Sequence, residues 1–260
     1  MNMENKMSDD TYARIMMEGT PNNKNPWMLQ CARTMANATK ILFESKFNKA
    51  PKSVLDLGCG VGQYTDILSR SNFDCLGVDK NINFVKWANT RNNNVEYKAI
   101  DLFDLKISNK FGIISATHEV FNIIEDYKLF INTFKDNMHE DGFMIFDIIT
   151  PFGFETWQDI QISERTDFLM VQKCIYRNDN KTGTVKLTGF VQNGIMFERF
   201  DVITHVYDHD IQDIFNYAKS LNLNIQFYHE WDDFTKNGNQ NFDKKFINMS
   251  TKVYCILSNK

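Results

Sequence analysis

The segment Val54–Gly62, with the sequence VLDLGCGVG, constrains the fold of this chain more than any other feature. A short apolar run, typical of a strand buried on both faces, leads directly into three glycines at alternate positions. Glycine takes positive φ angles and lets the backbone approach a ligand closely. Helical apolar spacing follows from Gln63. The segment therefore predicts a strand, a tight turn, and a helix whose amino end faces a bound anion.

The same alternation of strand and helix continues through the first 150 residues. Helical spacing predicts a first helix over 27–47 and, between the strands, helices over 63–69, 82–90 and 127–138. Short apolar runs predict five strands, over 53–57, 75–78, 95–100, 112–116 and 143–149. Strands and helices that alternate in this way indicate βαβ units and a parallel sheet covered on both faces.

The character of the chain changes after Pro151. Three β-rich runs, over 168–176, 184–191 and 197–206, are separated by turn-forming residues, and Asn193-Gly194 is a strong hairpin signal. A small antiparallel meander is therefore expected, followed by a helix and two strands, over 208–220, 224–229 and 252–257. We divide the chain into four parts: an N-terminal helical cap (1–50), an α/β core (51–150), an antiparallel β insertion (151–207) and C-terminal elements that complete the core sheet (208–260).

Composition excludes several classes of protein. The 29 basic and 33 acidic residues give a net charge of −4 and a pI near 5.8, without a Lys/Arg cluster of the kind that binds nucleic acid. The five cysteines are scattered and form no C-x-x-C pair, which argues against a disulfide framework or a zinc site. No apolar run is long enough for a signal peptide or a membrane span. We expect a cytoplasmic protein with no metal, no nucleic-acid partner and no membrane association.

Acidic residues lie at the carboxyl ends of the first three predicted strands. Asp56 lies two residues before the first glycine, where its charge would repel a dinucleotide pyrophosphate but suits a cationic amino-acid group. The third glycine lies four residues after the first, not five as in G-x-G-x-x-G, which disfavours a nicotinamide oxidoreductase. Asp79, 17 residues after Gly62, is placed to bind ribose hydroxyls or to cap the next helix. Asp101 follows the third strand.

Residues 53–150 resemble the class I S-adenosylmethionine-dependent methyltransferases, whose first motif VLDLGCGVG matches almost letter for letter. The resemblance implies S-adenosyl-L-methionine as cofactor and S-adenosyl-L-homocysteine as product. It also implies a Rossmann-like, mostly parallel sheet of seven strands whose last strand, here 252–257, is antiparallel. The implied cofactor-binding residues are Asp56, Gly58, Cys59, Gly60, Gly62, Asp79, Lys80, Asp101, Leu102 and Thr117.

The loop after the fourth strand lies beside the transferring methyl group in this family. Here it carries His118, whose imidazole titrates near neutrality and is suited to take a proton from an acceptor hydroxyl or ammonium group. The alternative is a histidine that caps the next helix or faces solvent. Glu119 is expected to orient His118 or to contact the acceptor. Tyr12 and Trp27 belong to an N-terminal segment that closes over the cofactor in this family, or else pack on the sheet; Tyr12 is kept as a third catalytic candidate.

The insertion resembles strands that small-molecule members of the family place over the active site. Its last predicted strand puts Arg199, Asp201, Ile203, His205 and Tyr207 on one face. Two interpretations have equal weight. The face is polar because it meets solvent, or it contacts the acceptor through Arg199, His205 and Tyr207, with Arg199 paired to an anionic group.

Methyl transfer to an oxygen or nitrogen of a small polar metabolite is the predicted function. Candidate acceptors include sugar- or nucleotide-linked compounds, as in polysaccharide or capsule biosynthesis. A nucleic-acid methyltransferase is one alternative; the pI and the sequence FDIITP at 146–151, in place of an Asn-Pro-Pro-Tyr-like motif, disfavour it. A non-catalytic cofactor-binding subunit is the other. The sequence does not indicate an oligomeric state.

Overall fold

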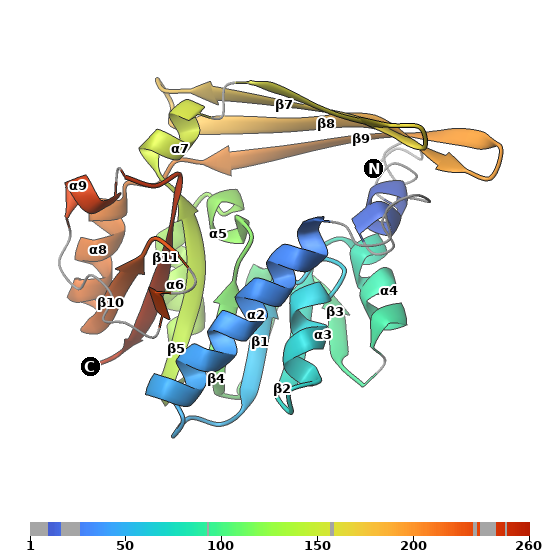
Figure 1. The fold of residues 1–260 in the computed structure, drawn as a ribbon. Helices are drawn as coiled ribbons and strands as arrows, with labels where there is room; N and C mark the ends of the chain where they lie inside the picture. The colour runs from blue at the N-terminus through green and yellow to red at the C-terminus, as the bar shows by residue number, and fades with distance from the viewer. Residues whose placement is uncertain are drawn as a thin grey trace.

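The computed structural model describes residues 10–16, 27–92, 94–156, 159–230, 233–234, 243–247 and 249–260. These residues form two sheets, one above the other (Figure 1). The larger sheet is covered by helices, and the smaller one lies across its upper edge. Residues 235–242 and the side chain of Trp27 fall outside the described part.

The core sheet has seven strands in the order β10-β11-β5-β4-β1-β2-β3. Strand β11 is antiparallel to both of its neighbours, and the β1, β2, β3, β4 and β5 pairs are parallel. The predicted α/β fold with an antiparallel last strand is therefore confirmed. The bounds of the strands are β1 (Ser53–Leu57), β2 (Asp74–Asp79), β3 (Glu96–Ala99), β4 (Phe111–Ala116), β5 (Met138–Ile149), β10 (Leu223–Tyr228) and β11 (Lys252–Asn259).

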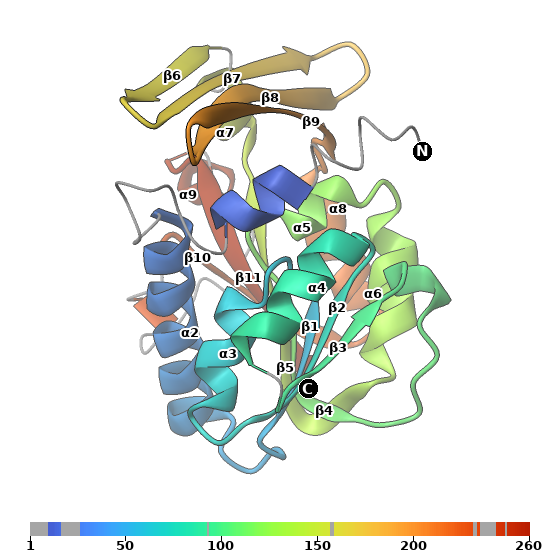
Figure 2. The same cartoon turned by 90° about the vertical axis from the view of Figure 1, so that its right-hand side faces the viewer.

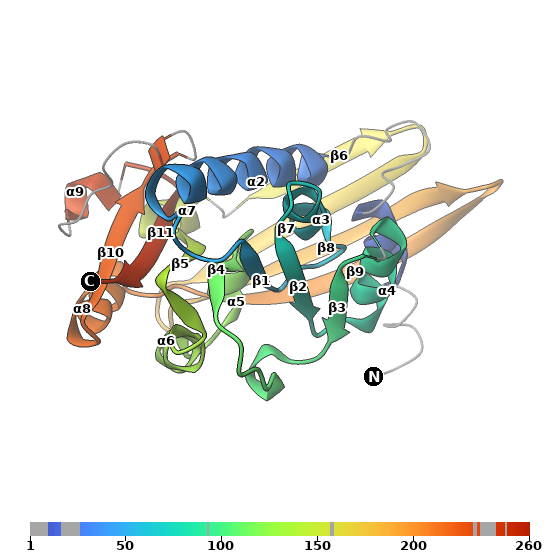
Figure 3. The same ribbon diagram turned by 90° about the horizontal axis from the view of Figure 1, so that it is seen from below.

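Helices cover both faces of the core sheet, as Figure 3 shows from below. One face carries α2 (Trp27–Lys46), α3 (Gln63–Ser69) and α4 (Ile82–Arg91), whose apolar side chains share one buried cluster with strand residues. The other face carries α6 (Tyr127–Lys135) and α8 (Ile211–Ser220). This two-sided cover explains why the strand sequences are apolar throughout instead of alternating.

Helix α6 is shorter than predicted. We expected a helix over 127–138, but α6 ends at Lys135 and Met138 already pairs with Phe111 as the first residue of β5. The apolar Met138 fits either a helix or a strand by its spacing. The parallel pairing with β4 is a long-range contact that local periodicity does not reveal.

A separate antiparallel sheet, here called the lid sheet, crosses the upper edge of the core (Figures 1 and 2). Its strands follow chain order: β6 (Ile160–Arg165), β7 (Phe168–Arg177), β8 (Thr182–Asn193) and β9 (Met196–Tyr207). The predicted meander is confirmed for its last three strands. Strand β6 was not predicted, because every one of its side chains is exposed and its sequence shows no buried face.

A short helix over residues 10–16 lies between the lid sheet and the core helices (Figure 2). On the lid side, the Arg14 guanidinium lies 2.7 Å from the Glu198 carboxylate. On the core side, the Gln63 amide of α3 donates to the Met16 carbonyl at 2.6 Å. This helix therefore connects the lid sheet to the helix that follows the glycine turn.

The other end of the lid sheet is attached through α5 (Val120–Ile123). Asn122, which is fully buried, donates to the Tyr207 carbonyl and accepts from the Ile149 amide, both at 3.0 Å. One side chain thus joins the end of β9 to the end of β5. The lid sheet is held at both ends and spans the edge between them.

The structure also bears on the predicted absence of disulfides and of membrane-spanning helices. All five cysteines are free thiols. In the described part of the chain, no helix combines the length and apolarity that a membrane span requires.

Phe200 is the packing centre of the lid sheet, so its removal tests this architecture. Its side chain is 1% exposed and stacks on Tyr12 and Phe168 with ring centroids 6.1 and 6.2 Å away. Phe200→Ala should lower the free energy of unfolding by about 3–5 kcal/mol, because it leaves a cavity between lid and helix. Phe197 lies on the same strand but is 53% exposed, and Phe197→Ala should change stability by less than about 0.5 kcal/mol. Equal losses in urea titrations of the two variants would contradict the buried position of Phe200.

Candidate active site

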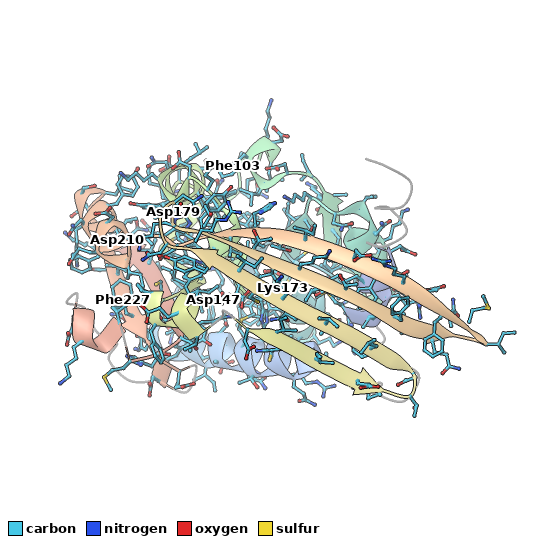
Figure 4. The ribbon with its side chains drawn as sticks, turned by 90° about the horizontal axis from the view of Figure 1, so that it is seen from above. Phe103, Asp147, Lys173, Asp179, Asp210 and Phe227 are labelled. Carbon is cyan, nitrogen blue, oxygen red and sulfur yellow. The ribbon has the colours of Figure 1, made fainter. Side chains whose placement is uncertain are left out.

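The carboxyl ends of the parallel strands bring acidic and polar residues to one edge of the core sheet. Strand β1 lies between β4 and β2. The chain adds β2 and β3 on one side of β1 and then crosses to add β4 and β5 on the other. Open α/β sheets bind ligands at such a switch point, outside the carboxyl ends of the strands. The lid sheet covers this same edge, as the view from above shows, with Lys173 of β7 on its outer side (Figure 4).

The glycine turn after β1 has a left-handed backbone at each of its three glycines, with φ of 71°, 55° and 72° at Gly58, Gly60 and Gly62. Two of these positions are filled by protein. A Cβ on Gly58 would lie 2.5 Å from Val120, and one on Gly62 would lie 2.6 Å from the Tyr97 hydroxyl. A Cβ on Gly60 would have no atom within 4 Å. Gly60 is therefore the point where a ligand can approach the turn.

Backbone hydrogen bonds fasten this turn to β2. The amides of Gly58 and Cys59 both donate to the Val78 carbonyl, at 2.7 and 3.0 Å. The buried Cys59 side chain packs toward Gly77. The backbone of Cys59 therefore lies at the predicted cofactor site, and its thiol points away toward Gly77.

Asp79 closes β2 directly beside Gly60. One carboxylate oxygen accepts from the Gly60 amide at 2.9 Å and the other from the Asn81 amide at 2.8 Å. Burial raises the pKa of Asp79, while these two backbone donors lower it. The alternative role as a helix cap is wrong, because Asn81 caps α4 with its own side chain. The neighbouring Lys80 side chain is exposed.

Asp56 has a different environment from Asp79. Its side chain is 3% exposed, and its carboxylate accepts from the hydroxyls of Thr65 at 2.5 Å and Ser115 at 2.8 Å. Burial raises the pKa of Asp56 to about 6, although both hydroxyls oppose the shift. Both oxygens therefore have partners within the chain, and Asp56 ties β1 to α3 and β4. Its direct contact with a cofactor stays a prediction.

Asp101 and Leu102 lie after β3, where the motif places them. Asp101 is exposed and accepts from the Phe103 amide at 3.0 Å, which caps a short 3-10 helix (Leu102–Asp104). Leu102 is half-buried against the main core. A role beside the adenine stays a prediction for both.

The turn after β4 is strained. His118 and Glu119 both have left-handed backbones, with φ of 60° and 69°, although neither is a glycine. Such a conformation costs roughly 1–2 kcal/mol per residue and persists where the surroundings enforce it, often at functional sites. The preceding Thr117 is buried. The turn lies against the glycine turn, because Val120 meets Gly58.

His118 is half-buried at this turn, and its Nε2 atom is shielded from solvent. Among the described residues, its Nε2 atom has no hydrogen-bond partner. Burial lowers the pKa of His118, and the positive charge of Lys252 lowers it further, against the opposing charges of Asp147 and Glu119. The alternative of a helix-capping histidine is wrong, since the cap position of α5 is Glu119. The site therefore holds a neutral imidazole with a free buried nitrogen.

Lys252 completes this part of the site and was not predicted. Its Nζ lies 2.6 Å from Glu119 Oε1 and 3.3 Å from Asp147 Oδ2. Burial disfavours its charge, but the two carboxylates raise its pKa above the usual range. Lys252 begins β11 and reaches β5 through antiparallel pairing, which local sequence does not show. In the sequence, the acidic Asp147 within the apolar run FMIFDII was the one sign that a basic partner is needed here.

Tyr12 reaches the site from the N-terminal helix. Its ring lies between Phe84 of α4 and Phe200 of the lid sheet, with centroids 6.2 and 6.1 Å away. Burial, with a contribution from the Glu119 carboxylate, raises the pKa of Tyr12 to about 12. The structure thus brings Tyr12, His118 and Glu119 to the same edge, and the phenol is neutral at physiological pH.

The predicted acceptor-binding residues of β9 do not face the site. Alternate residues of this strand, including Phe200 and Val206, turn toward the core, so Arg199 and His205 are exposed on the outer face. Arg199 pairs with Asp201 at 2.7 Å on that face. This placement favours the solvent-facing interpretation, and we assign no acceptor contact to Arg199 or His205. Tyr207, at the strand end, donates to Glu125 at 3.4 Å.

Metal chemistry has no evident site in the described ranges. Within them, no three histidine, cysteine or acidic side chains gather as a metal-binding group. The Glu119 and Asp147 carboxylates are both ion-paired to Lys252.

Comparison with known proteins places this geometry in a family. The family described as "Methyltransferase domain" matches residues 30–209. A malonyl-[acyl-carrier protein] O-methyltransferase of Calditerrivibrio nitroreducens is 23% identical over 130 residues, which cover 50% of each chain. The chain spans half or less of the length of this and other curated relatives that it matches.

Solved structures share the fold at low sequence identity. An S-adenosylmethionine-dependent methyltransferase from Clostridium acetobutylicum has a TM-score of 0.75 and 18% identity, covering 88% of this chain and 92% of its own. The sugar N-methyltransferase KedS8 from a Streptoalloteichus species has a TM-score of 0.65 and 12% identity, covering 88% of both chains. Both likenesses cover most of this chain.

The buried carboxyl of Asp56 predicts a pH-dependent stability. Its pKa near 6 in the folded state lies above the value near 3.9 of an unfolded chain. The folded protein therefore binds this proton more tightly, and the ionised group lowers stability as pH rises from about 4 to 6. Asp56→Asn lacks this titration, so its unfolding free energy relative to the unmodified protein should rise by up to about 3 kcal/mol between pH 4 and pH 7. A difference that stays constant in denaturant titrations over this range would contradict the assignment.

Proposed function

The chain belongs to the methyltransferase domain family, and we propose that it moves the methyl group of S-adenosylmethionine to an oxygen or nitrogen atom of a small polar metabolite. The observation that carries this proposal is the imidazole of His118, whose pKa is lowered by burial and whose buried Nε2 lacks a partner among the described residues. It lies on the turn that packs against the glycine turn. A proton acceptor is therefore present next to the segment that would hold the cofactor.

The glycine turn and Asp79 fit the cofactor. The open space over Gly60 accommodates a ligand, and a carboxylate with one oxygen on the Gly60 amide lies beside it. Carboxylates in this position accept hydrogen bonds from ribose hydroxyls. When bound, S-adenosylmethionine supplies an electrophilic methyl group on its sulfonium. Asp79, with the backbone of Gly60, would hold the nucleoside part, and Thr117 lies at the end of the adjacent β4.

His118 would handle the proton of the acceptor. A hydroxyl or an ammonium group becomes a nucleophile when it gives up a proton, and a neutral imidazole nitrogen can take it. Because burial lowers the pKa of His118, the imidazole loses its proton at a lower pH than an ordinary histidine does. The remaining contribution of the protein is to align the reactants and to exclude water, for which the lid sheet and the helix over 10–16 are placed.

A sugar-linked or amine-bearing metabolite is the acceptor class that we propose. The chain shares its fold with KedS8, a sugar N-methyltransferase, and with an amino pentose methyltransferase of TM-score 0.65. The net charge of −4 and the pI near 5.8 do not favour a nucleic-acid substrate. The test is formation of S-adenosylhomocysteine from S-adenosylmethionine with a panel of amino sugars, hydroxy sugars and their nucleotide-linked forms. Cofactor binding without turnover on any acceptor class would favour a non-catalytic subunit.

Asp79→Asn tests the cofactor site. The change removes the charge that strengthens hydrogen bonds to the ribose, so affinity for S-adenosylhomocysteine should fall by about 1.5–3 kcal/mol. Isothermal titration calorimetry gives the measurement. Asp74→Asn, at the exposed opposite end of the same strand, is the control and should bind normally. Unchanged affinity in Asp79→Asn would remove this assignment.

His118→Ala tests the proton acceptor. Turnover should fall by about 100-fold or more, the lower end of what a general base contributes, while affinity for S-adenosylhomocysteine stays within twofold. His205→Ala, on the outer face of the lid sheet, should keep the normal rate.

Two outcomes would contradict this role. A normal turnover rate in His118→Ala would mean that the acceptor needs no base, as for a carboxylate. Loss of cofactor binding would place His118 on the cofactor side of the site instead.

A further inference from the structure

A closed network of three charged groups surrounds the strained turn. The Glu119 amide donates to the Asp147 carboxylate at 3.1 Å, and Lys252 bridges the Glu119 and Asp147 side chains. The three residues come from the turn after β4, from β5 and from β11. Backbone and side chain of Glu119 are therefore both held, from two different strands.

This network accounts for a conformation that local sequence disfavours. His118 and Glu119 adopt left-handed φ angles without being glycines, so the turn needs outside contacts to persist. The C-terminal side is held by α5, where the amides of Asn122 and Ile123 donate to the Glu119 carbonyl. The N-terminal side continues into β4. Asp147 and Lys252 hold the point between these two ends.

We propose that Lys252, together with Asp147, is a positioning residue that holds the His118–Glu119 turn in its left-handed conformation and so keeps the His118 imidazole directed at the acceptor. The inference rests on the proposed function, in which His118 takes the acceptor's proton. Lys252 itself contacts neither cofactor nor acceptor in this assignment. It acts through Glu119 and Asp147.

The charged groups around His118 change its pKa in a way that packing contacts alone would not. The charged groups that act on it are Asp147 of β5, Lys252 of β11 and its neighbour Glu119. Tyr12 of the N-terminal helix, Cys174 of β7 and Tyr254 of β11 have their pKa values raised by burial and are neutral near pH 7. Lys252 lowers the pKa of His118 and Asp147 raises it. Loss of Lys252 should therefore raise the pKa of His118, and loss of Asp147 should lower it.

The experiment is an NMR titration of the imidazole nitrogens in ¹⁵N-labelled protein bound to S-adenosylhomocysteine, with His118 assigned from the His118→Gln variant. In Lys252→Met the pKa of His118 should rise, and in Asp147→Asn it should fall. Lys252→Arg, which keeps the charge, should resemble the unmodified protein. Lys135→Met, which removes a surface lysine ion-paired to Asp136 at 2.6 Å, is the control and should leave His118 unchanged.

Structure and turnover complete the test. In a crystal structure of Lys252→Met, the backbone at 118 and 119 should leave the left-handed region or lose order. With an acceptor identified by the panel, the variant should lose at least tenfold in kcat, keep cofactor affinity within twofold, and recover with arginine. If Lys252→Met does not fold, Lys252→Gln serves for the same measurements.

The two proposals fail separately. If Lys252→Met leaves both the titration of His118 and the turn unchanged, the positioning role is overturned, whatever His118→Ala does. If His118→Ala turns over normally while Lys252→Met still shifts the titration and the turn, the network holds the turn and the proposed base is wrong.

Discussion

The left-handed backbone of the glycine turn determines how the rest of the site is arranged. The turn is held to β2 because the Gly58 and Cys59 amides share the Val78 carbonyl. This contact places Gly60 beside Asp79, and the missing side chain of Gly58 lets Val120 pack against the turn. The predicted cofactor side and the proposed proton-accepting side of the site therefore meet at one glycine. A side chain at Gly58 would separate them as well as strain the backbone.

Buried charge is the second organising feature of the site. Asp56 is placed among hydroxyl donors, and in the Asp147–Glu119–Lys252 network one lysine pairs with two carboxylates. Buried ion pairs often contribute little net stability, because desolvation offsets their attraction. Their value here lies in geometry: each links strands that are distant in the chain, such as β5 and β11. The strained turn at His118 depends on such links.

The lid sheet adds a third element to the site, since it is attached at both ends of the edge that it covers. The helix over 10–16 joins it to α3, and Asn122 joins it to β5. Its inner face carries the apolar side chains that pack on Tyr12, while its charged residues Arg199 and Asp201 pair on the outer face. The sheet therefore acts on the site through coverage. Acceptor contacts are to be sought on its inner face, where burial and the charge of Glu119 raise the pKa of Cys174.

The sequence by itself determined the elements whose signal is local. The glycine spacing, the apolar strands and the Asn193-Gly194 turn predicted the α/β core and the meander. The resemblance to the methyltransferases implied the antiparallel last strand and a site role for Asp79 and His118 at strand ends. Tertiary structure alone decided which face of β9 meets the core, and that Lys252 stands 105 residues from Asp147 in sequence yet beside it in space. It also imposed the left-handed turn at His118, for which no glycine prepares the chain. Periodicity reports which residues share a face, but only packing against other elements decides which face is buried and which charges meet.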